Sequence, residues 1–179
     1  VLMLCIAFAS TICMAQTTHI VDNNVGTAPD FTDVQSAIDA AVTGDIIYVQ
    51  QSATSYGNVN ITDKGLTIIG RSSSDSSYKT QLSITLNENS SNTTIKGIEG
   101  NINESAQLVF DTIENIVISD CTLSNLTLQN QNNKNNILVQ GNVLTSGITI
   151  SGGTPGNILV TNNIFNGSTI TFSNPDTVL

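Results

Sequence analysis

The sequence predicts an all-β protein, a parallel β-solenoid of stacked coils with one short helix near its start. Three observations support this fold class. A nine-residue segment recurs at nearly constant spacing, its copies alternate apolar and polar residues as strands do, and the chain combines few charges with many Asn, Ser and Thr. A length of 179 residues suits one domain or part of a larger protein.

The segment 1–15 has the features of an incomplete signal peptide. Positions 1–8 are an apolar run, and small residues follow up to Ala15, after which we expect cleavage. No basic segment precedes the run, so the sequence is expected to begin inside the signal. The run is too short for a permanent membrane span; the alternative is a buried N-terminal strand or helix. We therefore expect a secreted or cell-surface protein without a membrane span.

Residues 16–45 are predicted to form an N-terminal cap with a helix over about 32–43. Thr32 is the expected N-cap, with Gln35 completing a capping box. Gly44 stands where a left-handed C-cap residue belongs, and a β-branched strand is expected directly after it, from Ile46. The apolar stripe of the helix has helical spacing: Val34, Ala37, Ile38 and Ala41.

Residues 46–179 repeat themselves and are expected to form about six coils. The segment 115–123 recurs at 136–144 and again at 157–165, so both steps equal 21, and a related copy that begins at Asn92 precedes them by a step of 23. A second apolar pair follows each copy, which predicts three short strands in every coil. Such a unit is too short for a β-α-β crossover, but its strands can pair with their copies in the next coil, about 4.8 Å away.

The same periodicity predicts which residues turn the chain and which fill the core. Left-handed backbone is expected at equivalent bend positions: Gly70, Gly97, Asp120, Gly141 and Asn162. Inward positions are expected at three equivalent sets: Ile116, Ile118, Cys121 and Leu123; Ile137, Val139, Asn142 and Leu144; Ile158, Val160, Asn163 and Phe165. The amides of Asn142 and Asn163 are predicted to stack as a hydrogen-bonded ladder. Cys121 occupies their slot, where a small buried hydrophobe is favoured over a reactive thiol.

One part of the chain resembles a known family. The segments FTDVQSAIDAA (31–41), GDIIYV (44–49) and LTIIG (66–70), together with Tyr56, are similar to the N-terminal cap and opening coil of the pectin lyase-like superfamily. The resemblance implies a right-handed parallel β-helix. It implies no single activity, because that superfamily includes lyases, hydrolases, esterases, adhesins and surface proteins.

The sequence identifies no catalytic residues and leaves enzymatic activity uncertain. None of the family's catalytic constellations can be matched, the one Arg (Arg71) lies in a Ser-rich stretch, and the one His (His19) lies close to the expected cleavage site. Glu99 and Asp120 are separated by one repeat step and are the candidates for a calcium site, although their registers differ by two positions. The alternative is that they are solvated acids. No other cofactor is expected.

The composition and the outward positions set the function that we expect. Five Lys and Arg against 14 Asp and Glu give a net charge of −9, which excludes a phosphate-neutralising surface and hence nucleic acid. Outward Thr, Asn, Gln and Ser can hydrogen-bond sugars, and Tyr78 is the tyrosine that could stack on one.

Two functions remain open. We expect a surface scaffold that binds polysaccharide or a cell-surface glycan, or mediates adhesion. The alternative is the N-terminal part of a polysaccharide lyase or pectin esterase-like enzyme whose catalytic coils are missing, because residues 174–179 resemble the start of a further coil and the solenoid is expected to be truncated there.

Overall fold

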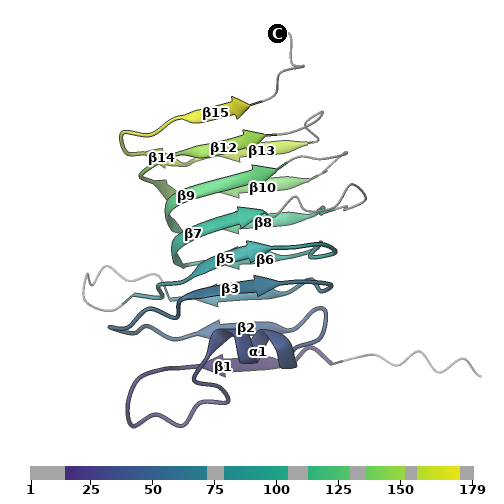
Figure 1. Cartoon of the computed structure of the whole chain (residues 1–179), viewed down its shortest axis with the longest axis vertical. Coiled ribbons are helices and arrows are strands. Elements are labelled where there is room, and N and C mark those ends of the chain that lie inside the picture. The colour runs from purple at the N-terminus through teal and green to yellow at the C-terminus, as the bar shows by residue number, and fades with distance from the viewer. Residues whose placement is uncertain (1–14, 72–78, 105–112, 130–135, 152–156, 174–179) are drawn as a thin grey trace, which may run out of the picture.

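The computed structural model describes residues 15–71, 79–104, 113–129, 136–151 and 157–173. Within them the chain winds into a stack of parallel strands, with one sheet in front and one behind in the view of Figure 1. All paired strands are parallel, and each strand pairs with its copy in the neighbouring coil. The predicted all-β solenoid is therefore confirmed.

The two sheets have the following composition. Sheet 1 contains, in spatial order, β1 (Thr18–Val21), β2 (Ile46–Val49), β4 (Thr67–Gly70), β6 (Thr94–Lys96), β8 (Ile116–Ser119), β10 (Ile137–Gln140) and β13 (Ile158–Thr161). Sheet 2 contains β3 (Asn58–Ile61), β5 (Ser83–Leu86), β7 (Glu99–Glu104), β9 (Thr122–Gln129), β11 (Val143–Leu144) and β14 (Ile164–Phe165), and β12 (Ile148–Ser151) and β15 (Ile170–Ser173) extend it.

The strand registers reproduce the predicted period in the second half of the chain. Ile116, Ile137 and Ile158 are consecutive partners, so both of these steps equal 21. Thr94 pairs with Val117, which gives the predicted step of 23, whereas the step from Thr67 to Thr94 is longer, at 27. The additional residues belong to the segments that connect the strands, so the strands themselves pair without a shift in register.

Three separate strands per coil occur only in the last two described coils. β9 is continuous and pairs with β11 through its first residues and with β12 through its last. The break between β11 and β12 comes at Gly147, whose φ of 108° no strand residue adopts. Asn125 occupies the corresponding position in β9, so the earlier coil runs on as one strand.

The predicted inward residues form the core. The four predicted residues of the 116–123 and 137–144 coils are buried in each case, whereas Ile158, Val160 and Phe165 of the last coil are only partly buried. The amide ladder is confirmed: Asn142 Nδ2 donates to Asn163 Oδ1 at 3.0 Å, and the Cys121 N–H donates to Asn142 Oδ1 at 2.9 Å. Buried polar groups in this corner therefore satisfy one another.

Four of the five predicted left-handed bend residues have positive φ, with values of 67° for Gly97, 54° for Asp120, 67° for Gly141 and 54° for Asn162. The prediction for Gly70 is wrong, because Gly70 is not among the residues with positive φ. Glycine is needed there for space: a Cβ would lie 2.4 Å from the carbonyl oxygen of Gly97. Close approach of neighbouring coils, and not turn geometry, selects this residue.

The helix is shorter than predicted: it begins two residues later and ends three residues earlier, and its N-cap lies one residue later. α1 (Val34–Ala40) has Asp33 as its N-cap, and the Asp33 carboxylate accepts the Ser36 N–H at 2.8 Å. The Thr32 capping box is wrong because Gln35 instead bonds the Asn60 backbone, accepting its N–H at 2.7 Å. Gly44 has φ +95° but lies beyond Ala41, the C-cap.

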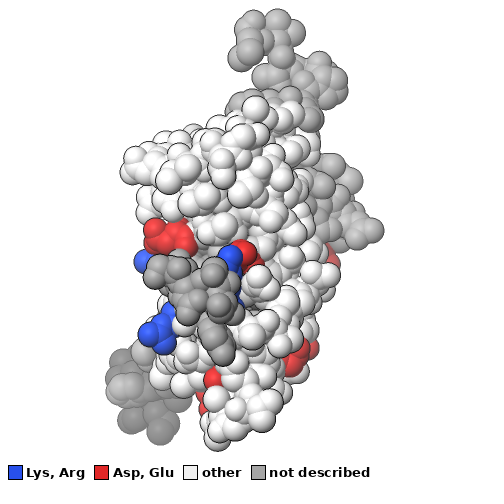
Figure 2. Space-filling view, turned by 90° about the vertical axis from the view of Figure 1, so that its left-hand side faces the viewer, with Lys and Arg blue, Asp and Glu red and all other residues white. Residues whose placement is uncertain are grey.

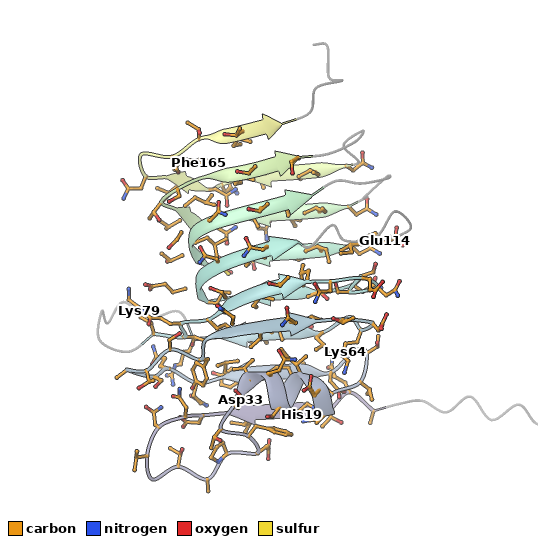
Figure 3. The ribbon with its side chains drawn as sticks, in the orientation of Figure 1. His19, Asp33, Lys64, Lys79, Glu114 and Phe165 are labelled. Atoms are coloured by element: carbon orange, nitrogen blue, oxygen red, sulfur yellow. The ribbon has the colours of Figure 1, made fainter. Side chains whose placement is uncertain are left out.

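Lys64 completes the C-terminal end of α1. Its Nζ donates to the carbonyl oxygens of Ile38 and Ala41 at 3.0 and 2.9 Å. Figure 3 labels Asp33 and Lys64 beside this helix, which packs against β1, β2 and β3. The two side chains satisfy backbone groups that a short helix leaves unpaired.

The first strand was not expected. β1 pairs with β2 in register, Thr18 with Ile46 and Val21 with Val49, so sheet 1 begins before the predicted boundary at residue 46. The segment that joins these two strands contains α1, which makes this step longer than those of the later coils. The predicted signal peptide lies almost wholly outside the described residues. In the described part of the chain, no helix has the length and hydropathy needed to cross a membrane.

Candidate functional site

The outward face of sheet 2 carries a continuous column of short polar side chains. Successive strand pairings align one position from each of six strands, which we call the outer column: Asn60, Thr85, Asn103, Thr127, Thr149 and Thr171. Its members are all partly or fully exposed, since side chains alternate between the core and solvent along each strand. The column presents hydroxyl and amide groups at the spacing of the strands.

A second set of polar side chains lies beside the outer column, nearer the start of each strand. We call it the inner column: Asn58, Ser83, Asn101 and Asn125. Asn101 Nδ2 donates to Ser83 Oγ at 3.4 Å, and Asn125 Nδ2 donates to Thr127 Oγ1 at 2.9 Å. Neither column contains a charged residue, so the two columns offer hydrogen bonds without net charge.

A groove crosses the beginnings of four neighbouring strands and is bordered by Asn58 and Ser83 of the inner column. It has a volume of about 250 Å³ and is lined by residues at the start of β3, β5, β7 and β9: Ser55, Gly57, Asn58, Gln81, Leu82, Ser83, Glu99, Gly100 and Ser124. Because adjacent strands supply the lining, the groove runs across the strands and therefore along the axis of the stack. Its direction matches that of both columns.

Gly100, in the groove lining, lets β5 and β7 approach each other closely. A Cβ at this position would lie 2.1 Å from the carbonyl oxygen of Leu82, so no side chain fits between β5 and β7. The register of β7 also shifts between Gly100 and Asn101, as in a β-bulge. The groove was not predicted, because this irregularity is not part of the repeat. The one sequence signal for it is Glu99-Gly100, where the alternation of apolar and polar residues is interrupted.

Two ion pairs join neighbouring coils near the corner between β6 and β7. Lys79 Nζ contacts Glu99 Oε2 at 2.6 Å, and Lys96 Nζ contacts Asp120 Oδ2 at 3.3 Å. A small hollow of about 30 Å³ beside them is lined in part by Arg71, Lys79 and Glu99. Figure 2 shows Lys, Arg, Asp and Glu as a few spots on a largely uncharged surface.

The two calcium candidates thus lie at successive corners, and each is engaged by a different lysine. Glu99 also pairs with Thr122 across the strands and not with Asp120, as the two-position offset of their registers requires. Within the described residues, no group of three or more His, Cys, Asp or Glu side chains is arranged to hold a metal ion. Calcium binding by Glu99 and Asp120 stays a prediction.

His19 and Asp45 form a structural pair outside this face. Burial alone would raise the pKa of Asp45, but hydrogen bonds from the Val42 and Thr17 N–H groups and from His19 hold it below its usual value. His19 Nε2 lies 3.1 Å from Asp45 Oδ2, and its ring packs edge-on against Phe31. These contacts join β1 to the turn before β2.

Cys121 is a buried free thiol, as predicted. Burial raises its pKa to about 11, although backbone N–H groups of Ile98 and Gly97 act in the opposite direction. Its Sγ lies 3.1 Å from the carbonyl oxygen of Ser119. At neutral pH the group is a protonated thiol inside the core, which does not suit a nucleophile.

The groove is lined mainly by groups that form hydrogen bonds. Among the described residues that line it, Glu99 is the only one with a carboxyl group. Glycoside hydrolysis ordinarily uses two carboxyl groups about 5–9.5 Å apart. Amide, hydroxyl and backbone groups make up the rest of the lining.

The tyrosines add no aromatic surface to the described part of this face. Tyr78, the expected stacking residue, lies outside the described residues. Tyr56 is buried, and its hydroxyl donates to the Gln50 carbonyl oxygen at 3.0 Å.

A second hollow lies on sheet 1 and differs in character. It has a volume of about 420 Å³ and spans only β10 and β13, with a lining of Asn136, Ile137, Leu138, Asn157, Ile158 and Leu159. Leu159 is 60% exposed. This hollow is larger than the groove, but its lining is mainly apolar and it crosses only two strands. It therefore offers few hydrogen-bonding groups to a ligand.

The fold and the two polar columns define a β-solenoid protein whose sheet 2 presents rows of uncharged, hydrogen-bonding side chains to solvent. Comparison of the chain with protein-family models, with curated proteins and with solved structures found no match. The functional conclusion therefore depends on the geometry of sheet 2.

Proposed function

We propose that this protein is a secreted or cell-surface scaffold that binds carbohydrate on the outward face of sheet 2. The observation that carries the proposal is the groove of about 250 Å³ that crosses four strands beside two uncharged polar columns. Hydroxyl and amide groups donate and accept hydrogen bonds in the way that sugar hydroxyls do. An adhesive role would use the same face.

Charge favours a neutral glycan. The chain has a net charge of −9, and long-range repulsion opposes the approach of an acidic polymer. Two of the described cations, Lys79 and Lys96, are already paired with Glu99 and Asp120. An uncharged polysaccharide meets the columns without this cost.

The expectations about origin and family belong to the same proposal. We propose that residues 1–15 direct export, which is supported by their apolar run and the small residues before Ala15. We further propose a right-handed solenoid of the pectin lyase-like type. This is supported by the parallel stacking and by the FTDVQSAIDAA and GDIIYV segments.

Retention on insoluble polysaccharides tests carbohydrate binding. The full chain should be retained on at least one neutral polysaccharide. The double substitution Asn58→Ala with Ser83→Ala should weaken retention about tenfold or more, because each lost hydrogen bond is worth about 1 kcal/mol. The matched control is Thr67→Ala with Thr94→Ala, at outward positions of sheet 1, and it should leave retention unchanged.

Two outcomes would contradict the proposal. Equal weakening by both double substitutions would remove sheet 2 as the site. Release of unsaturated or de-esterified products from a polysaccharide would instead favour a lyase or esterase.

A further inference from the structure

We propose that the bound glycan lies parallel to the solenoid axis with one sugar facing each coil, and that it is a linear, extended, uncharged, β-linked chain. This inference rests on the proposed carbohydrate binding. It specifies the ligand class and the direction of the ligand on the face.

The first argument is the direction of the groove. Its lining comes from the beginning of four strands that are neighbours in sheet 2, in the order β3, β5, β7 and β9. A polymer seated in it therefore crosses the strands at a steep angle and passes from coil to coil. A chain laid along a single strand would leave the groove within one coil.

The second argument is the repeat of the outer column. Thr85, Thr127 and Thr149 hold equivalent positions in three strands, and strand pairing joins them with the other members of the column into one row across six strands. Neighbouring strands lie about 4.8 Å apart. This spacing is close to the advance per sugar of an extended β-linked chain, so successive sugars meet equivalent side chains.

The third argument concerns which polymers this face rejects. A strongly curved chain, such as an α-1,4-linked glucan, leaves a straight column after a few units. An anionic chain finds no cationic side chain in the columns of Asn, Ser and Thr and is opposed by the net charge of −9.

Chain-length dependence tests the inference directly. Binding of β-1,4-linked gluco-, manno- and xylo-oligosaccharides of two to eight units would be measured by calorimetry, with α-1,4-linked glucose oligomers of the same lengths as control. For at least one β-linked series, affinity should rise with each added unit and level off at about six units, the number of strands in the outer column. The α-linked series should show no such rise.

Hydroxyl removal locates the contacts. Thr85→Val and Thr149→Val keep the side-chain shape and remove one hydroxyl, and each should weaken binding of the six-unit ligand by about fivefold. Thr94→Val, at an outward position of sheet 1, is the matched control and should have no effect. Circular dichroism and urea midpoints of each variant would confirm that the fold is unchanged.

The outcomes separate this inference from the proposed function. Binding that is the same for two and for eight units, or equal for α- and β-linked series, would overturn the axial arrangement while leaving carbohydrate binding intact. Unchanged affinity in both Thr85→Val and Thr149→Val would also overturn it. Absence of binding to every neutral oligosaccharide and polysaccharide would overturn the proposed function itself.

Discussion

The bend between β10 and β11 is held from inside by buried amides. Asn142 is fully buried, and its Nδ2 donates to the Ile118 carbonyl oxygen at 3.0 Å as well as to Asn163. Asn163 repeats the contact one coil later, donating to the Val139 carbonyl oxygen at 2.9 Å. The amides thus join neighbouring coils through their side chains.

Removing the Asn142 amide should be costly. Asn142→Ala leaves the Cys121 N–H and the Ile118 carbonyl without their partners, so we expect a loss of about 2–4 kcal/mol in the free energy of unfolding, measured in urea. Asn163→Ala, in the partly buried last slot, should cost less. A larger loss from Asn163→Ala would contradict this account of the ladder.

Cys121 occupies the ladder position one coil earlier, and an asparagine should fit there. Its Sγ already faces the Ser119 and Ile95 carbonyl oxygens, which correspond to the carbonyls that the amides of Asn163 and Asn142 use. Cys121→Asn should therefore be neutral or stabilise the fold by about 1 kcal/mol, whereas Cys121→Leu should destabilise it by overpacking. Destabilisation by Cys121→Asn beyond about 1 kcal/mol, measured by urea unfolding, would show that the slot is not equivalent.

The Asp45 carboxylate predicts an acid-sensitive contribution to stability. Its pKa is lowered in the folded state, so its contribution is present above the unfolded value of 3.8 and is lost as pH falls through the lower folded value. Asp45→Asn should be less stable than the parent by about 1 kcal/mol near neutral pH. The difference should shrink as pH falls below 3.8. A constant difference across this range in urea titrations would contradict the assignment.

At the scale of elements, substitutions at the start of α1 should show which of two neighbouring residues, Thr32 or Asp33, caps the helix. Asp33→Ala should lower the free energy of unfolding by about 1 kcal/mol, because the Ser36 N–H loses its acceptor. Thr32→Ala should have almost no effect. Equal losses, read from thermal or urea unfolding, would restore Thr32 as the cap. The error in the prediction arose because Ser, Thr and Asp are all good caps and local sequence does not rank adjacent ones.

Other elements show where local patterns are sufficient. The apolar positions of α1 and of β8, β10 and β13 were predicted because burial follows the helical and strand periods. β1 was not predicted, because it has only four residues and its partner β2 does not follow at the repeat spacing of 21–23 residues. The role of the asparagines that begin the repeats was not predicted. Asn115 and Asn136 have φ of 58° and 63°, and the side-chain amide of each donates to the equivalent asparagine of the preceding coil, which forms a second, exposed ladder.

At the scale of the whole molecule, the period and the composition together predicted the solenoid and its polar outer faces. They did not predict the groove, because it depends on the shift at Gly100 and on four coils meeting there. Nor did they predict the lysine partners of Glu99 and Asp120, since the side chains of different coils meet only after the coils are stacked. The repeat therefore predicts the pairing register of the strands, whereas the groove depends on residues that depart from the repeat.

The central claim is that coils stack in register and carry the outer column along one axis. Pulsed electron paramagnetic resonance tests it with nitroxide pairs at Asn60 and Thr149 and at Asn60 and Thr171, in a background in which Cys5, Cys13 and Cys121 are replaced by Ser. These pairs are four and five strand steps apart. The account predicts backbone separations of about 19 and about 24 Å, differing by one strand spacing. Equal separations, or a difference of several spacings, would contradict it.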